Sequence, residues 1–152
     1  MENELAVLPP TTKRVEFHTS RAVNREIEAR TIANISRFTG RTSEAVRDRL
    51  TQLDNEWDTE RTLETMAGTL TVMGTLLGLT VSRRWFIMPA LVGGFLVQHA
   101  IQGWCPPLAV IRRMGVRTAE EIANERVALK TMRGDFQATD NTHEALAQAR
   151  MA

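Results

Sequence analysis

The sequence predicts an all-α fold, a two-helix transmembrane hairpin with flanking amphipathic helices, and three observations predict it. Two long runs, residues 65–82 and 85–111, contain no charged residue apart from the titratable His99. Only Arg83 and Arg84 separate the two runs. The segments on either side are polar and carry apolar residues at helical spacing. Because a bilayer core needs roughly 17–25 apolar helical residues, each run reaches the lower end of the required length. We therefore expect two spans joined by a tight turn.

The chain before the hairpin is predicted to contain an arm and two helices. Residues 1–18 include two adjacent prolines and lack helical periodicity, so we expect an extended or disordered arm. Residues 19–58 carry one apolar stripe on each side of Gly40, which predicts two amphipathic helices. Each stripe must be covered by the other helix, by a second subunit or by the lipid surface. The sequence leaves these three alternatives open.

The hairpin itself is expected at residues 59–116, with spans at about 63–82 and 85–103. Small residues in both spans are typical of membrane helices, because they let two backbones approach closely. The spacing leaves open whether these small residues face a helix interface or lipid. The candidate helix-packing positions are Gly68, Gly74, Gly78, Ala90 and Gly94.

The chain after the hairpin is predicted to hold one more helix and a tail. Pro106 and Pro107 end the second span, since proline cannot donate a backbone hydrogen bond and restricts the residue before it. A capping box at residues 118–121 opens a helix within residues 117–134. Residues 135–152 are polar and are expected to be a mobile tail.

The composition excludes several classes of function. The 19 basic and 18 acidic residues give a formal charge of +1, so no basic excess favours nucleic acid. The three histidines lie in separate regions of the chain, which argues against a metal site. No phosphate-binding loop or nucleophile motif occurs. We therefore expect no enzymatic activity, no cofactor and no nucleic-acid partner.

Cys105 is the candidate reactive thiol. It is the single cysteine of the chain, and the nearby Arg112 and Arg113 would favour its thiolate form. The alternative interpretation is a small apolar residue packed where the helix turns. His99 likewise has two interpretations, an interfacial histidine or a member of a proton relay.

One segment of the chain resembles a known family. Residues 60–115 read ERTLETMAGTLTVMGTLLGLTVSRRWFIMPALVGGFLVQHAIQGWCPPLAVIRRMG. They resemble the YgaP-like transmembrane domain, a family of bacterial inner-membrane proteins without an assigned general function. The family motif is carried by Gly103, Trp104, Cys105 and Pro106, followed by an apolar segment and a basic pair.

The resemblance implies a hairpin in the bacterial inner membrane that forms a homodimer. Some relatives carry a fused rhodanese-like sulfurtransferase domain, which implies a cytoplasmic protein partner of that kind. This chain has neither the length nor the strands for such a domain. Basic residues are more frequent outside the hairpin than at the turn, so both termini are expected in the cytoplasm.

Three functions follow as expectations. The first is a non-enzymatic membrane protein whose hairpin dimerises and anchors helical arms for docking a partner or the lipid surface. The second is the handling or transport of a small anion or sulfur species through a dimer of hairpins, with Cys105 at its mouth. The third is a soluble helical bundle whose core is formed by the two apolar runs.

Overall fold

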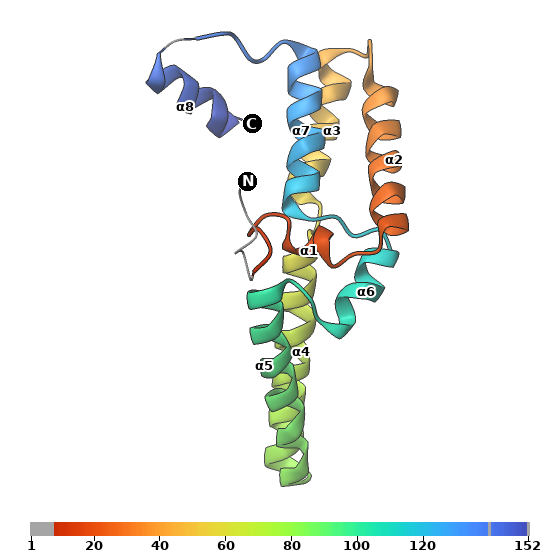
Figure 1. Cartoon of the computed structure of the whole chain (residues 1–152), viewed down its shortest axis with the longest axis vertical. Helices are drawn as coiled ribbons and strands as arrows, with labels where there is room; N and C mark the ends of the chain where they lie inside the picture. Colours follow the sequence, from red (N-terminus) through yellow and green to blue (C-terminus); the bar gives the residue numbers. More distant parts are fainter. Residues whose placement is uncertain (1–7, 140, 152) are drawn as a thin grey trace, which may run out of the picture. The chain divides into compact units, whose positions relative to one another are not determined.

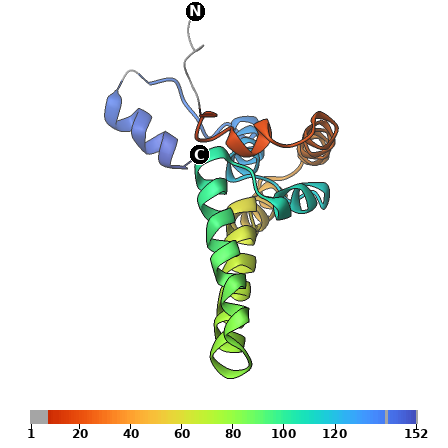
Figure 2. The same cartoon turned by 60° about the horizontal axis from the view of Figure 1, so that its bottom comes forward.

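The computed structural model describes residues 8–139 and 141–151, and Figures 1 and 2 show its helices in two views. The described residues form helices and no strand, which confirms the all-α class. Residues 1–7 of the expected arm lie outside the described residues. The helices are α1 (Arg14–Phe17), α2 (Arg21–Phe38), α3 (Ser43–Asn55), α4 (Thr59–Thr80), the 3₁₀ turn η1 (Arg83–Phe86), α5 (Ile87–Gln102), α6 (Pro106–Arg113), α7 (Ala119–Arg133) and α8 (Thr142–Met151).

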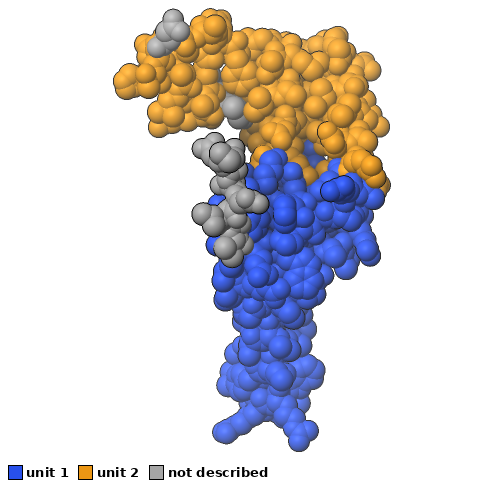
Figure 3. All heavy atoms as spheres, in the orientation of Figure 1, with its two compact units in different colours: residues 1–24, 57–118 blue, residues 25–56, 119–152 orange. Residues whose placement is uncertain are grey.

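The chain divides into two compact units, which Figure 3 shows in different colours. Unit 1 comprises residues 1–24 and 57–118, and therefore contains α1, α4, η1, α5 and α6. Unit 2 comprises residues 25–56 and 119–152, and contains most of α2 together with α3, α7 and α8.

In unit 1, α4 begins at a side-chain cap, and several of its threonines form hydrogen bonds within the helix. The carboxylate of Asp58 accepts a hydrogen bond from the backbone N–H of Arg61 at 2.7 Å. Further along, the hydroxyls of Thr69, Thr75 and Thr80 each donate to the carbonyl four residues earlier, at 2.7, 2.8 and 2.7 Å. These threonines therefore need no partner outside the helix.

A short turn connects α4 to α5. The backbone N–H of Val81 still bonds to Leu77, and the four residues of η1 follow. The expected tight turn at the two arginines is thus a 3₁₀ turn that also takes the first residues of the expected second span. At its other end α5 stops at Gly103, whose φ of 76° is the left-handed conformation that glycine adopts without strain.

The helices α4 and α5 lie side by side in both ribbon views and pack through two glycines (Figures 1 and 2). A Cβ at Gly74 would stand 2.7 Å from Cδ of Pro89, and a Cβ at Gly78 would stand 3.0 Å from the ring of Phe86. The absence of a side chain at these two positions allows the two helices to approach closely. Gly68 and Gly94, in contrast, have open space where a Cβ would lie.

A small apolar core joins α1, α4 and α6 within unit 1. Its buried members are Val15, Leu63, Cys105, Leu108 and Ile111. Contrary to the expectation of an arm without helix, residues 14–17 form the helical turn α1, because burying Val15 in this core favours an ordered turn that local periodicity does not reveal.

Buried polar contacts tie the segments of unit 1 together. The guanidinium of Arg112, which is 1% exposed, donates to the Thr19 hydroxyl, the Val116 carbonyl and the Asn24 side chain at 3.1, 2.9 and 3.0 Å. Thr59 donates from both its backbone N–H and its hydroxyl to the carbonyl of Arg117, at 2.8 and 3.0 Å. These bonds fix the start of α4 and the end of the segment after α6.

Unit 2 is a small bundle in which α7 covers the apolar stripes of the preceding helices. Its buried core consists of Val46, Leu50, Leu53, Ile122 and Leu129, with Ile35 and Phe38 packed against it. An ion pair between Arg49 and Glu125, 2.8 Å long, crosses from α3 to α7. The sequence left the other helix, a second subunit or the lipid surface open as the partner of each stripe, and α7 was not among them. Helical periodicity identifies an apolar face but not the segment that packs on it.

The tail after α7 is partly ordered. Gly134 ends α7 with a φ of 84°, as the sequence predicts. Residues 142–151 form α8, and its Gln148 side chain accepts a hydrogen bond from the backbone N–H of Gln137 at 2.9 Å.

Candidate functional site

One membrane-length segment occurs among the described residues. It is residues 83–102, formed by η1 and α5, and only 6% of it is buried. The expected first span does not meet the same criterion, since α4 carries charged residues in its first turns and threonines throughout. The core helix of a soluble protein would be mostly buried, whereas most of α5 is exposed.

The outer faces of α4 and α5 are apolar and exposed. Large apolar side chains on both helices are more than a third exposed: Met66, Leu70, Val72, Met73, Leu76, Leu79, Ile87, Leu91, Phe95, Leu96, Val97 and Ile101. A contiguous apolar surface of this extent is rare on a soluble monomer and marks contact with lipid or with protein.

Aromatic and basic side chains stand at the ends of this surface. Trp85 lies just before α5 and Trp104 just after it, and both are partly exposed. At the start of α4, the guanidinium of Arg61 lies over the ring of Trp57, 4.5 Å from its centroid. Tryptophan is typical of the membrane–water interface, where its ring meets both lipid and headgroups.

Where α4 begins and α5 ends, unit 1 holds a cluster of polar side chains that the sequence did not reveal. Nε2 of His99 lies 3.0 Å from Oε2 of Glu60, and Nη2 of Arg14 lies 2.7 Å from Oε1 of the same carboxylate. His99 is only 4% exposed. Cys105, the N-cap residue of α6, is also 4% exposed. Three side chains from α1, α4 and α5 therefore form one hydrogen-bonded group.

The electrostatics of the cluster favour a charged Glu60. Its hydrogen bond with His99, and then the positive charges of His99 and Arg14, hold the pKa of the Glu60 carboxyl below its ordinary value, against the opposing effect of partial burial. Glu60 thus remains a carboxylate at neutral pH and accepts hydrogen bonds from both neighbours.

Residues 53–121 match the family of YgaP-like inner membrane proteins, transmembrane domain. This match confirms the resemblance predicted from residues 60–115, and it indicates a membrane protein of the inner membrane. The YgaP-like segment includes all of α4, α5 and α6. It contains Glu60, His99 and Cys105, whereas Arg14 lies outside it. No curated protein and no solved structure gave a match.

Within the YgaP-like segment, the motif residues predicted from the sequence have distinct surroundings. Gly103 packs closely on α1, since a Cβ there would lie 2.6 Å from Cβ of Arg14. Pro106 opens α6 at a position where a missing N–H is tolerated. Cys105 caps the same helix and is buried in the core of unit 1. Arg112, expected to support the thiolate, instead directs its guanidinium to Thr19, Asn24 and Val116.

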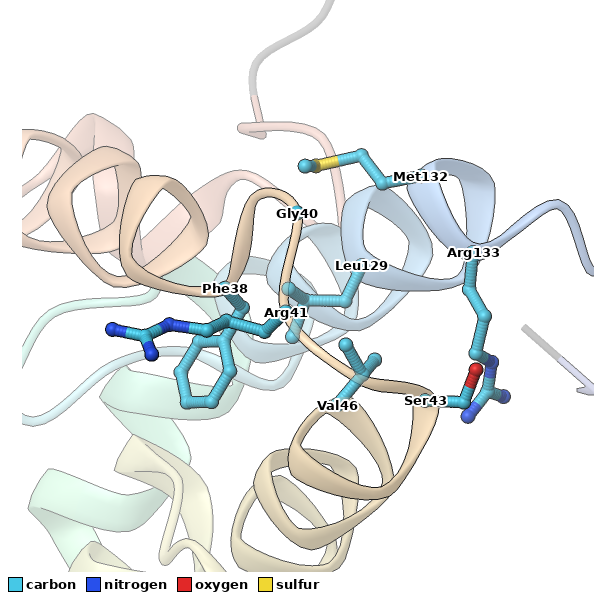
Figure 4. Close-up of a pocket in the computed structure, with 8 residues that line it drawn as sticks. All are labelled: Phe38, Gly40, Arg41, Ser43, Val46, Leu129, Met132 and Arg133. Atoms are coloured by element: carbon cyan, nitrogen blue, oxygen red, sulfur yellow. The ribbon is translucent and has the colours of Figure 1, made fainter.

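Outside the YgaP-like segment, unit 2 has a cavity of about 260 Å³ that Figure 4 shows in close-up. It is lined by Phe38, Gly40, Arg41, Ser43, Val46, Leu129, Met132 and Arg133. The side chains of Arg41 and Arg133 extend in different directions in this view. Arg133 also pairs with Asp135. The two cations therefore do not converge on a common anion position.

A metal centre is not evident in the described ranges 8–139 and 141–151, where no group of three or more His, Cys, Asp or Glu side chains is arranged to hold an ion. The cluster around His99 is therefore described by its hydrogen bonds to Glu60 and from Arg14 to the same carboxylate.

Proposed function

We propose that the protein is a non-enzymatic integral membrane protein in which α4 and α5 insert as a hairpin and anchor helical arms at the cytoplasmic face of the inner membrane. The observation that carries the proposal is the exposed apolar surface of the two helices. Burying one large apolar side chain stabilises a protein by about 1.5–3 kcal/mol, so leaving a dozen of them in water would be strongly unfavourable. Lipid removes this penalty.

The helix lengths support a complete crossing. From Leu63 to its end at Thr80, α4 rises about 27 Å at 1.5 Å per residue. This length approaches the hydrocarbon thickness of about 30 Å. Within the span, threonine hydroxyls donate to their own helix, which is what a low-dielectric environment requires of polar groups. The low mean hydropathy of α4 is therefore compatible with a lipid environment.

The distribution of basic residues supports an orientation with both termini in the cytoplasm. Arg61 precedes the first span, and Arg112 and Arg113 follow the second. The positive-inside tendency favours this basic end at the cytoplasmic face. The exposed Arg83 and Arg84 at the turn can reach the opposite headgroups by extending their side chains.

A homodimer is the proposed assembly in the membrane. Gly68 on α4 and Gly94 on α5 have open space beside their Cα atoms, so neither is used in packing α4 on α5. Such positions allow the helices of a second copy to approach closely. The bundle of α2, α3 and α7 would then be presented twice to a cytoplasmic protein partner, which is a rhodanese-like domain in some relatives.

Fractionation with a carbonate wash tests the membrane assignment. The wild-type protein should stay in the washed membrane. Leu91→Asp, which places a charge on the exposed apolar face of α5, should lower the retained fraction, since a charge at the bilayer centre costs about 2.5–3.5 kcal/mol on insertion scales. The matched control is Ile32→Asp on the exposed face of α2, which should leave retention unchanged. Recovery of the wild type in the soluble pool would instead favour a helical bundle.

A further inference from the structure

Another cavity lies within unit 1, beside α6. It has a volume of about 160 Å³ and is lined by the segment between α1 and α2, the first turn of α2, and α6. All of these lining residues belong to unit 1. The lining includes the basic side chains of His18, Arg112 and Arg113 and no acidic side chain. Drug-sized ligands occupy pockets of about 300–1,000 Å³, so this cavity suits a smaller, negatively charged group.

We propose that this cavity binds the phosphate of an anionic phospholipid headgroup at the cytoplasmic surface of the membrane. The inference rests on the proposed insertion of α4 and α5 in lipid, and it adds a binding site and a lipid class to that function. Arg113, His18 and Ser20 are the binding residues, and Arg112 is a positioning residue.

The place of α6 in unit 1 favours a headgroup over a ligand from solution. The helix begins at Pro106, shortly after α5 ends at Gln102. Both ribbon views show α6 beside the end of the α4–α5 pair that is opposite to η1 (Figures 1 and 2). Between α5 and α6 in the chain, Trp104 is partly exposed, which is typical of an aromatic residue at the membrane interface. Once α4 and α5 lie in lipid, the cavity is level with the headgroups.

The face of α6 next to the cavity is apolar and exposed. Val110 is 58% and Met114 is 73% exposed, and their spacing of four residues puts them on one side of the helix. Ala109 and Arg113 share the adjacent side, which lines the cavity. A helix with an apolar and a basic side is typical of a segment that lies in the membrane interface. A lipid can therefore place its acyl chains along Val110 and Met114 and its phosphate in the cavity.

Arg113 supplies the main charge of the proposed site. Its side chain is exposed, and within the described ranges its guanidinium forms no hydrogen bond or ion pair. A guanidinium can donate two parallel hydrogen bonds to a phosphate. The hydroxyl of Ser20 accepts from the backbone N–H of Val23 at 3.4 Å, which leaves its proton to donate. The His18 ring provides a further N–H donor.

Arg112 holds the two sides of the cavity together. Its guanidinium donates to the hydroxyl of Thr19 at 3.1 Å and to the side chain of Asn24 at 3.0 Å. The Thr19 hydroxyl in turn donates to the carbonyl of Val15 at 2.7 Å. These bonds connect α6 to the segment that carries His18 and Ser20, so the donors are in place before a ligand arrives. Such preorganisation reduces the entropy lost on binding.

The first test uses the full chain in neutral detergent micelles, titrated with a short-chain phosphatidylglycerol while native mass spectrometry counts the bound lipids. The wild type should bind this lipid more tightly than a phosphatidylcholine of equal chain length, since the choline cation offsets the phosphate charge. Arg113→Gln should weaken phosphatidylglycerol binding about tenfold or more, because one hydrogen-bonded charge is lost. Arg47→Gln, which removes an exposed arginine of α3, is the matched control and should keep the wild-type affinity.

A second pair of variants separates the cavity from diffuse charge attraction. Ala109→Phe fills the cavity without changing the charge and should weaken phosphatidylglycerol binding about as much as Arg113→Gln does. Val110→Phe adds the same ring on the exposed side of α6 outside the cavity and should leave binding unchanged. Both positions are exposed, so the fold has room for the ring. Unchanged affinity in Ala109→Phe, or equal binding of the two lipids by the wild type, overturns the proposal.

Inorganic phosphate separates a lipid site from a site for the free anion. Phosphate that displaces phosphatidylglycerol at equal concentration would show a free-anion site and overturn the lipid assignment. Carbonate retention is measured on the same variants, and Arg113→Gln should stay in the washed membrane. A retained protein without preference for the anionic lipid would sink this inference alone, whereas a wild type lost from the membrane would overturn the proposed insertion.

Discussion

Nε2 of His99, in the last turn of α5, lies 3.0 Å from Oε2 of Glu60, in the first turn of α4. This bond joins two residues 39 positions apart and closes the end of the α4–α5 pair opposite to η1. Arg14 bonds to the other oxygen of the same carboxylate. Glu60 is therefore the residue through which α1, α4 and α5 are connected.

Loss of the Glu60 charge should destabilise unit 1. In Glu60→Gln, His99 and Arg14 lose their shared carboxylate, and the free energy of unfolding should fall by about 1–2 kcal/mol. This is less than the range of about 1.5–3 kcal/mol for hydrogen bonds to charged groups, because the Glu60 side chain is 35% exposed and solvent screens its charge. Thermal unfolding in a mild detergent measures the change. The control is Glu26→Gln, which removes an exposed ion pair with Arg30 and should change stability by less than about 0.5 kcal/mol.

The contribution of Glu60 should also depend on pH. Its pKa is lowered in the folded protein, so the folded state favours the carboxylate, and the stabilisation is fully present above the ordinary value of 4.5. It is lost as the pH falls through the lowered folded value. The difference in unfolding free energy between wild type and Glu60→Gln should be constant from about pH 6 to neutral pH and shrink in acid. A difference that grows on acidification would contradict the charge assignment.

Gly74 should tolerate no side chain. A Cβ there meets Cδ of Pro89 at 2.7 Å, so Gly74→Ala forces α4 and α5 apart and should lower the unfolding free energy by about 1–3 kcal/mol, the usual effect of overpacking. Gly93→Ala, on α5 with open space at its Cβ, is the matched control. Equal melting temperatures for the two variants would argue against this packing.

The ion pair of unit 2 should be sensitive to truncation. Glu125 is fully buried and pairs with Arg49 at 2.8 Å, so Glu125→Ala leaves a cation without its partner and should destabilise the unit by about 3–5 kcal/mol. Asp54→Ala removes a more exposed pair with Arg126 and should have a much smaller effect. Chemical denaturation followed by circular dichroism compares the two variants.

Local signals in the sequence explain several of the helix ends. Thr42 caps α3 through its hydroxyl, and Gly40, Gly103 and Gly134 take the left-handed conformations expected of helix stops. These features depend on residues within one turn of each other, so they can be read from a single stretch of chain.

Contacts between distant segments could not be predicted in this way. Neither the pairing of Glu60 with His99 nor the cover by Arg14 leaves a local pattern, because each depends on how helices far apart in the chain come together. The family motif at Gly103–Pro106 correctly identified the segment between α5 and α6 as part of the YgaP-like domain. It could not reveal the hydrogen bond of His99 to Glu60, since His99 was interpreted from its position in an apolar run.

The most direct test of a complete crossing is the side of the membrane at which the turn between α4 and α5 can be labelled. In a Cys105→Ser background, Ser82→Cys places a single thiol at the exposed turn. A membrane-impermeant maleimide added to intact spheroplasts should label this thiol, and Thr139→Cys in the C-terminal segment should react only after the membrane is permeabilised. Labelling of both positions in intact spheroplasts, or of Thr139→Cys alone, would contradict a hairpin with cytoplasmic termini.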